Sequence, residues 1–266
     1  MVSVCKAGRP IEMRHGGNDA AVLLIHGYAG YPGELTRPAR DLYKAGYDVF
    51  APRLPGHATN GEDFSRTHGK DWLGAAVKEA EELRKSYRTL CLLGHSMGGT
   101  LSILTASKVP VDKLVLAAPG VYAPGEKKPV NLGLLRVLSI FKKRMRTKWQ
   151  SDPGYIMYYE DAPGDDEYLG SEYWSWLYLP QLVDLMGLMD EAQRAASSIS
   201  CPTLIIGAGK DAVVGLSGPE YLSKAIKGSK YVVVPGSTHY LFYDKDKDAE
   251  EEAVQAVLGF CGERNA

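Results

Sequence analysis

The sequence is poor in the features that define several classes of protein. Lysine and arginine (31) nearly balance aspartate and glutamate (32), and the net charge of −1 argues against nucleic acid as a main partner. The four cysteines are scattered without a C-x-x-C pair, so neither a disulfide framework nor a metal site is expected. No apolar run is long enough to cross a bilayer, and the N-terminus lacks the long apolar run of a signal peptide. These absences predict a soluble, cytoplasmic protein.

The apolar and helical patterns predict a single α/β domain. A length of 266 residues suits one large domain with a sizeable core. Short apolar runs alternate with helical patterns, which indicates a mainly parallel sheet with helices on both faces. Asp71 is expected to cap a helix. Strands are expected near 22–25, 48–51, 89–93, 113–117, 203–206 and 230–234, and helices near 33–45, 71–86, 97–108, 217–227 and 248–260.

The pentapeptide Gly-His-Ser-Met-Gly at 94–98 follows directly on the apolar run at 90–93. This pattern is typical of a sharp turn between a strand and a helix with a serine at its apex, the nucleophile elbow. The flanking glycines matter because a side chain there would crowd a turn held in a strained conformation. The motif and its context predict Ser96 as a nucleophile. The alternative is a glycine-rich turn of the kind found in any α/β protein.

A serine nucleophile needs a base to take its proton and an acid to orient that base. His239 is the one histidine that lies C-terminal to Ser96, and it follows the apolar run at 231–234. Asp211 follows the run at 203–206 and is therefore expected at the carboxyl end of the neighbouring strand. We predict Asp211 as the acid, with a turn-capping role as the alternative.

Three other histidines are given no catalytic role. His95 precedes the predicted nucleophile, but adjacent strand residues point to opposite faces, so its side chain should aim away from the reaction and pack at the elbow. His57 and His68 are expected near the mouth of the site.

Acyl transfer places negative charge on a carbonyl oxygen, which backbone N–H groups stabilise. One donor should be the N–H of Met97, directly after the serine. The second should come from the loop after the apolar run at 21–25, where Gly27 and Gly30 let the backbone turn inward. We therefore predict the Tyr28 N–H as the second donor and expect Gly27 to contact the substrate.

Residues 121–199 interrupt the alternation of strands and helices. Because the segment is too long for a plain connection, we expect a cap inserted over the serine, with the core formed by residues 1–120 and 200–266. Its aromatic residues, Tyr158, Trp174 and Trp176 among them, either line a substrate pocket or join the cap to the core. An apolar stretch ending in a basic run could contact a lipid surface, although such a run is more often a solvated face.

Together these motifs resemble the α/β-hydrolase superfamily, and more narrowly its small bacterial carboxylesterase and monoacylglycerol lipase branch. Ala58 stands where members of that branch often carry glycine, which affects the expected shape of its loop. The resemblance implies an α/β-hydrolase fold and a serine esterase or lipase without cofactor or metal. It covers about 20–118 and 200–262, on the stretches HGYAG at 26–30, PRLPGH at 52–57, GHSMGG at 94–99, GAGKD at 207–211 and GSTH at 236–239.

The predicted activity is hydrolysis of carboxylic esters with short to medium acyl chains, through an acyl-enzyme on Ser96. Since His239 must be neutral to act as a base, the rate should fall as the pH drops through roughly 6–7. Thioesterases, aminopeptidases, lipases, C–C bond hydrolases and acyltransferases share this constellation, and a ligand-binding protein with a vestigial triad is a further alternative. The expected partner is a small-molecule ester, and the oligomeric state is left open.

Overall fold

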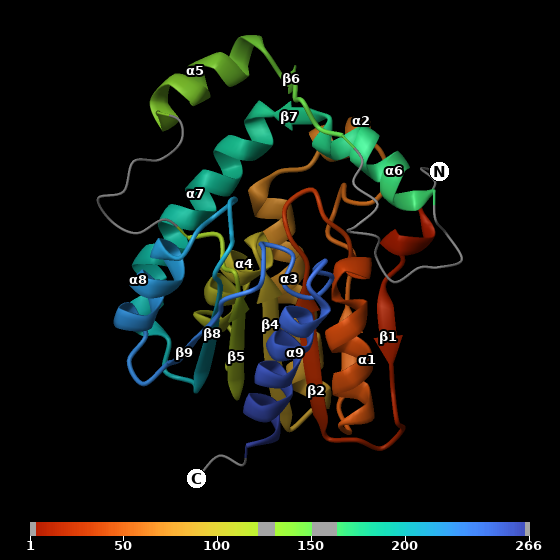
Figure 1. Ribbon diagram of the computed structural model, residues 1–266, viewed down its shortest axis with the longest axis vertical. Coiled ribbons are helices and arrows are strands. Elements are labelled where there is room, and N and C mark those ends of the chain that lie inside the picture. Colours follow the sequence, from red (N-terminus) through yellow and green to blue (C-terminus); the bar gives the residue numbers. More distant parts are fainter. Residues whose placement is uncertain (1–3, 122–130, 151–163, 264–266) are drawn as a thin grey trace.

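The computed structural model describes residues 4–121, 131–150 and 164–263. Within these ranges the molecule is built on a seven-stranded sheet in the order β1-β3-β2-β4-β5-β8-β9 (Figure 1). All neighbouring pairs are parallel except β1 with β3, so the predicted mainly parallel sheet is confirmed. The strands are β1 (Ile11–Met13), β2 (Ala20–Ile25), β3 (Asp48–Ala51), β4 (Thr89–His95), β5 (Lys113–Ala117), β8 (Thr203–Ala208) and β9 (Lys230–Val234).

Helices cover both faces of this sheet (Figure 1). α1 and α9 contact each other on one face, and α3 and α4 contact each other on the other. The expected start of α3 was wrong by two residues, since the helix begins at Gly69. Asp71 caps it from the third helical position, where its carboxylate accepts the N–H of the N-cap residue His68 at 2.9 Å. The core helices are α1 (Thr36–Lys44), α3 (Gly69–Ser86), α4 (Met97–Ala106), α8 (Ser217–Ala225) and α9 (Lys247–Gly262), with η1 (Lys6–Gly8), η2 (Pro32–Leu35) and α2 (Gly61–Ser65) between them.

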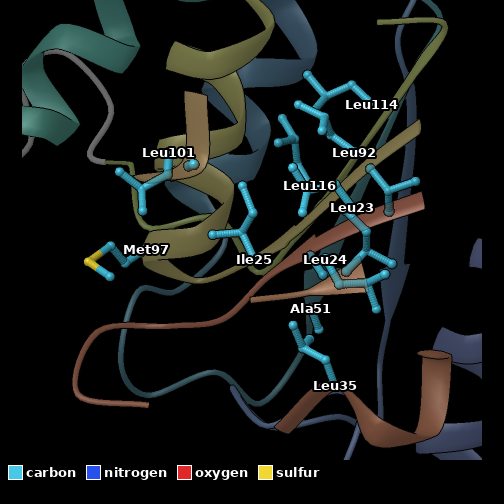
Figure 2. Close-up of a cluster of buried hydrophobic side chains, with 14 of the residues drawn as sticks. Leu23, Leu24, Ile25, Leu35, Ala51, Leu92, Met97, Leu101, Leu114 and Leu116 are labelled. Carbon is cyan, nitrogen blue, oxygen red and sulfur yellow. The ribbon is translucent and has the colours of Figure 1, made fainter. Parts of the chain in front are cut away.

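The middle residues of the central strands are apolar, as expected for strands whose two faces are both buried by helices. Leu23 of β2 pairs with Leu92 of β4, which pairs with Leu114 of β5. Figure 2 shows these side chains in one cluster, with Met97 and Leu101 of α4 beside the end of β2. The carboxyl ends of β2, β4, β5, β8 and β9 therefore meet at one edge of the sheet.

The region between β5 and β8 forms a layer beyond this edge (Figure 1). α7 packs on α4, and α5 packs on α7 from the outside. β6 and β7 form a separate antiparallel pair. The described elements here are α5 (Leu132–Phe141), β6 (Arg144–Arg146), α6 (Asp165–Leu169), a π-helical turn η4 (Gly170–Trp174), β7 (Trp176–Tyr178), α7 (Leu179–Ala195) and η5 (Ala196–Ser198). Its assignment as a separate cap domain stays a prediction.

The loop after β3 adopts a strained conformation at Ala58. This residue has φ of +55°, in the left-handed region that favours glycine. Its methyl group packs against the N-terminal segment, where a Cβ on Gly8 would lie 2.3 Å from the Ala58 Cβ. Alanine is accommodated at position 58 because the opposing residue has no side chain.

Candidate active site

Ser96 stands at the apex of a sharp turn between β4 and α4. Its backbone is left-handed, with φ of 55° and ψ of −118°. The flanking glycines are required sterically, since a Cβ on Gly94 would lie 2.1 Å from the Gly98 carbonyl oxygen and a Cβ on Gly98 would lie 1.9 Å from that of Ile25. The local structure is therefore that of a nucleophile elbow.

Two loops at the same edge of the sheet bring His239 and Asp211 to this serine. The His239 Nε2 lies 2.9 Å from the Ser96 Oγ, and the His239 Nδ1 lies 2.8 Å from the Asp211 Oδ2. A carboxylate can only accept, so Nδ1–H donates to Asp211 and Nε2 is left to accept the serine O–H. The other carboxylate oxygen accepts the N–H groups of Val213 and Val214 at 2.7 and 2.9 Å. The three residues predicted from the sequence thus form one continuous chain of hydrogen bonds.

The electrostatics suit a neutral base. Burial lowers the pKa of His239 below that of ordinary histidine, more than the Asp211 hydrogen bond raises it. Burial alone would raise the pKa of Asp211, but its bonds to His239 and to two backbone N–H groups hold it below the ordinary value. At neutral pH this combination gives an uncharged imidazole beside an ionised carboxylate.

A further carboxylate, not predicted from the sequence, fixes the histidine loop. Asp244 is buried, and its Oδ2 accepts the Thr238 N–H at 2.6 Å, the Thr238 hydroxyl at 2.8 Å and the Ser237 hydroxyl at 3.0 Å. An acidic residue five positions after the histidine is too common a pattern to have indicated this role.

The predicted oxyanion donors lie where the sequence placed them, at the first residue of α4 and in the loop after β2. Within the described residues, neither the Met97 N–H nor the Tyr28 N–H donates to a protein acceptor. The Gly27 N–H instead donates to Glu34 Oε2 at 3.3 Å, and a Cβ on Gly27 would lie 3.4 Å from the Ser96 Cβ. The loop at Gly27 thus lies within van der Waals distance of the serine.

Two other histidines take structural positions. His26 is buried, donating from Nδ1 to the Gly27 carbonyl at 3.0 Å and accepting the Leu54 N–H at Nε2. His57 is also fully buried, against His26, Phe64 and Trp72, so its expected place at the mouth of the site is wrong. Burial lowers the pKa of both rings. His68 is partly exposed and bonds Asp184 at 2.8 Å.

The aromatic residues predicted to bind substrate lie in different surroundings. Trp174 stacks on Tyr31 of the loop that carries Tyr28, with ring centroids 6.4 Å apart. Trp176 lies under two guanidinium groups, those of Arg144 at 4.1 Å and Arg146 at 4.8 Å. Tyr158 lies outside the described residues.

Other residues of this layer join it to the core. The buried Tyr173 hydroxyl accepts the Thr59 N–H at 2.8 Å and donates to the Gly56 carbonyl at 3.0 Å. The Gln181 amide donates to the carbonyls of Ser65 and Thr67 at 3.0 Å each. For these side chains, and for Tyr178 against Phe64, joining the two layers is the role the structure shows.

α7 passes close to the elbow. A Cβ on Gly120 would lie 3.0 Å from the Met189 Cε and 3.5 Å from the Ser96 carbonyl group. No pattern in the sequence indicated Met189, since its contact depends on how α7 packs on α4. In the described ranges, no helix is long and apolar enough to span a membrane, and no group of three or more metal-ligating side chains comes together.

Comparison with known proteins agrees with this geometry. The family model described as serine aminopeptidase S33 matches residues 16–246. A thermostable monoacylglycerol lipase of Bacillus sp. strain H-257 is 28% identical over 239 residues, covering 85% of each chain. A carboxylesterase of Bacillus subtilis is 23% identical over 247 residues, covering 91% of this chain and 93% of its own. A solved metagenome-derived lipolytic enzyme, one of LipS and LipT, superposes with a TM-score of 0.78 at 23% identity, over 97% of this chain and 99% of its own.

The fold and these matches define a serine hydrolase of the α/β-hydrolase superfamily. Within that class the chain belongs to the serine aminopeptidase S33 family. The predicted α/β-hydrolase fold and the resemblance to bacterial carboxylesterases and monoacylglycerol lipases are both confirmed.

Proposed function

We propose that this enzyme hydrolyses carboxylic esters through an acyl-enzyme on Ser96. The observation that carries the proposal is the hydrogen-bond chain from the Ser96 Oγ through His239 to Asp211, at 2.9 and 2.8 Å. The names of its relatives, a monoacylglycerol lipase and a carboxylesterase, support esters as the substrate class. An ester of glycerol or another small alcohol with a short to medium acyl chain is the substrate we propose.

The residues divide the reaction between them as follows. Ser96 Oγ attacks the ester carbonyl while His239 Nε2 takes its proton, and Asp211 stabilises the imidazolium that forms. The N–H groups of Met97 and Tyr28 bind the oxyanion of the tetrahedral intermediate. His239 then returns the proton to the leaving alcohol, and a water activated by the same histidine attacks the acyl-enzyme and releases the acid.

The first test is release of p-nitrophenol from acetate, butyrate, octanoate and laurate esters, together with release of glycerol from monoacylglycerols of the same chain lengths. We expect turnover with an optimum among the shorter acyl chains. The Ser96→Ala variant should lose about 10³-fold or more of kcat, since it removes the nucleophile. Circular dichroism of that variant controls for folding.

Two further assays distinguish an esterase from the alternative functions. Acyl-CoA thioesters and aminoacyl arylamides test for a thioesterase and for the peptidase activity that the family name describes. A fluorophosphonate probe tests whether Ser96 is reactive at all. Preference for a thioester or an arylamide by kcat/KM would contradict the ester proposal, and a folded protein that the probe does not label would favour a binding protein.

We also propose that the outer surface of α5 contacts the lipid aggregate that presents such esters. Leu134, Val137, Ile140 and Phe141 are 54–83% exposed on this helix. Between residues 131 and 150 the chain carries six lysines and arginines and no acidic residue. An exposed apolar face bordered by cations is complementary to an anionic lipid surface.

A further inference from the structure

A second pair of buried ionisable side chains lies beside the proposed triad and takes no part in the reaction described above. Glu34 of η2 and His95 at the end of β4 are only 3% and 2% exposed. The His95 Nδ1 lies 3.2 Å from the Glu34 Oε2. Two such groups, 61 residues apart, are costly to bury unless every polar atom is paired.

The Glu34 carboxylate holds the loop that carries the Tyr28 N–H. Its Oε2 accepts the Gly27 N–H at 3.3 Å and its Oε1 accepts the Tyr31 N–H at 3.1 Å, on either side of Tyr28. The loop also wraps the carboxylate sterically, since a Cβ on Gly30 would lie 1.6 Å from the Glu34 Oε1. The position of the proposed oxyanion donor is thus tied to this one side chain.

The His95 ring holds the opposite side of the site. Its Nε2 lies 2.8 Å from the carbonyl oxygen of His239. Both ring nitrogens of His95 therefore face groups that only accept hydrogen bonds, a carboxylate and a carbonyl. A neutral imidazole has a single N–H, so both contacts are satisfied only by an imidazolium. Glu34 and His95 form a buried carboxylate–imidazolium pair.

We propose that Glu34 and His95 are positioning residues, which link the oxyanion loop to the backbone of the catalytic histidine and so fix both relative to Ser96. This inference rests on the proposed function of Ser96 and His239. Its geometry is independent of that function, because the pair bonds the N–H groups on either side of Tyr28 and the carbonyl of His239 rather than any reacting atom.

The charges around the pair favour this ionisation state. Burial alone would lower the pKa of His95 and raise that of Glu34, but their mutual attraction reverses both shifts. His26 also faces Glu34, and the Asp211 carboxylate acts on His95 from the far side of His239. The His95 imidazolium in turn lowers the pKa of His239, which keeps the base neutral.

The first experiment observes the pair directly and does not depend on activity. In ¹⁵N-histidine NMR spectra of the folded enzyme at about pH 7.5, one unit above the ordinary histidine pKa, we expect one buried imidazolium with two slowly exchanging N–H protons. The signal should vanish in His95→Gln and become that of a neutral ring in Glu34→Gln. If His95 is neutral in the wild type at this pH, the proposal is overturned.

The second experiment measures positioning. We expect His95→Gln and Glu34→Gln each to lower kcat, and the rate of fluorophosphonate labelling of Ser96, about 10- to 100-fold, because small displacements of catalytic groups have effects of this size. KM should change less than kcat. Because the two residues act as one unit, the double variant should lose about as much as either single variant.

A change in the pH profile separates positioning from mere packing. Removal of the His95 charge should raise the pKa of His239, so the acidic limb of kcat/KM, or of the labelling rate, moves to higher pH in His95→Gln. Asp48→Asn is the matched control: it neutralises a buried carboxylate that accepts the Tyr87 hydroxyl at 2.7 Å, and should leave the profile in place because it lies at the start of β3, at the opposite edge of the sheet from the elbow. Wild-type rates and an unmoved limb in a folded His95→Gln variant would overturn the proposal. A wild type that the probe does not label would instead contradict the proposed function.

Discussion

At the scale of the residue, the candidate active site depends on which nitrogen of the His239 ring can accept a proton. Asp211 accepts hydrogen bonds from two backbone N–H groups and one imidazole N–H, and these bonds hold its carboxylate facing His239. His239 is held at its carbonyl by His95 and at Nδ1 by Asp211. Its Nε2 therefore remains directed at Ser96, and the reactivity that we propose for the serine depends on the hydrogen bonds that His239 makes with Asp211 and His95.

The pH dependence of the reaction follows from the lowered pKa of His239. A base with a lowered pKa stays neutral further into acid, so kcat/KM should be level at neutral pH and fall only below about 6.5. In Asp211→Asn the group that raises this pKa is lost, so the acidic limb should move to lower pH. The same variant should lose about 10³- to 10⁴-fold of kcat, since the imidazole loses its orientation.

These values are obtained from rates of ester hydrolysis between about pH 4 and 9. Thermal unfolding at each pH controls for loss of the fold. An acidic limb above pH 7, or a rate that is level down to pH 4, would count against His239 as the base.

At the scale of the element, a glycine in the turn between β4 and α4 has no room for a Cβ, whereas a glycine in the middle of α3 does. Gly98 lies at the start of α4 against the end of β2, where a Cβ would meet the Ile25 carbonyl oxygen at 1.9 Å. Gly74 lies in α3 with no atom within 4 Å of its Cβ position. The same substitution should have opposite effects at the two sites.

We expect Gly98→Ala to lower the free energy of unfolding by about 3 kcal/mol or more, because backbone must shift to admit the methyl group. Gly74→Ala should raise it by about 1 kcal/mol, since alanine favours the helix over glycine. Urea unfolding measures both. Equal effects in the two variants would contradict the steric account of the elbow.

The elements that could be predicted from the sequence are those marked by a pattern of neighbouring residues. The central strands are continuous apolar runs, and the order Ser96, Asp211, His239 with each residue after a strand placed all three at one edge of the sheet. β1 was missed because it has only three residues and no fully buried side chain. Glu34 was not predicted for a different reason. Its carboxylate is buried because it pairs with His95, 61 residues further along the chain, and no local spacing of residues indicates such a pair.

At the scale of the whole molecule, charge is unevenly distributed although the total is only −1. Within the described residues, α5 and β6 lie in the outermost layer (Figure 1) and carry cations and exposed apolar side chains. α5 packs inward through Leu135 against Leu179 and Met186. Ser96 lies on the inner side of α7, and this surface lies on its outer side. Lipid contact would thus leave the sheet and the triad undisturbed.

This arrangement predicts binding to vesicles that contain anionic phospholipid, and weaker binding to purely zwitterionic ones. Ile140→Ser with Phe141→Ser should reduce the bound fraction about tenfold or more, because each apolar side chain contributes about 1.5–3 kcal/mol when fully buried. Hydrolysis of a soluble short-chain ester should not change. Co-flotation with vesicles at low and high salt measures the effect, and equal flotation of variant and wild type would refute a role for α5.

The contact between Ala58 and Gly8 has a consequence for how this sequence can change over time. A methyl group at position 8 is excluded while one is present at position 58, because the two would overlap at 2.3 Å. A change from alanine to glycine at position 58 removes the left-handed strain and the shortest contact, and leaves the carbonyl oxygen of residue 58 at 3.1 Å from a Cβ at position 8. The two sites are therefore epistatic, and the order of substitution is fixed: position 58 must lose its side chain before position 8 can gain one.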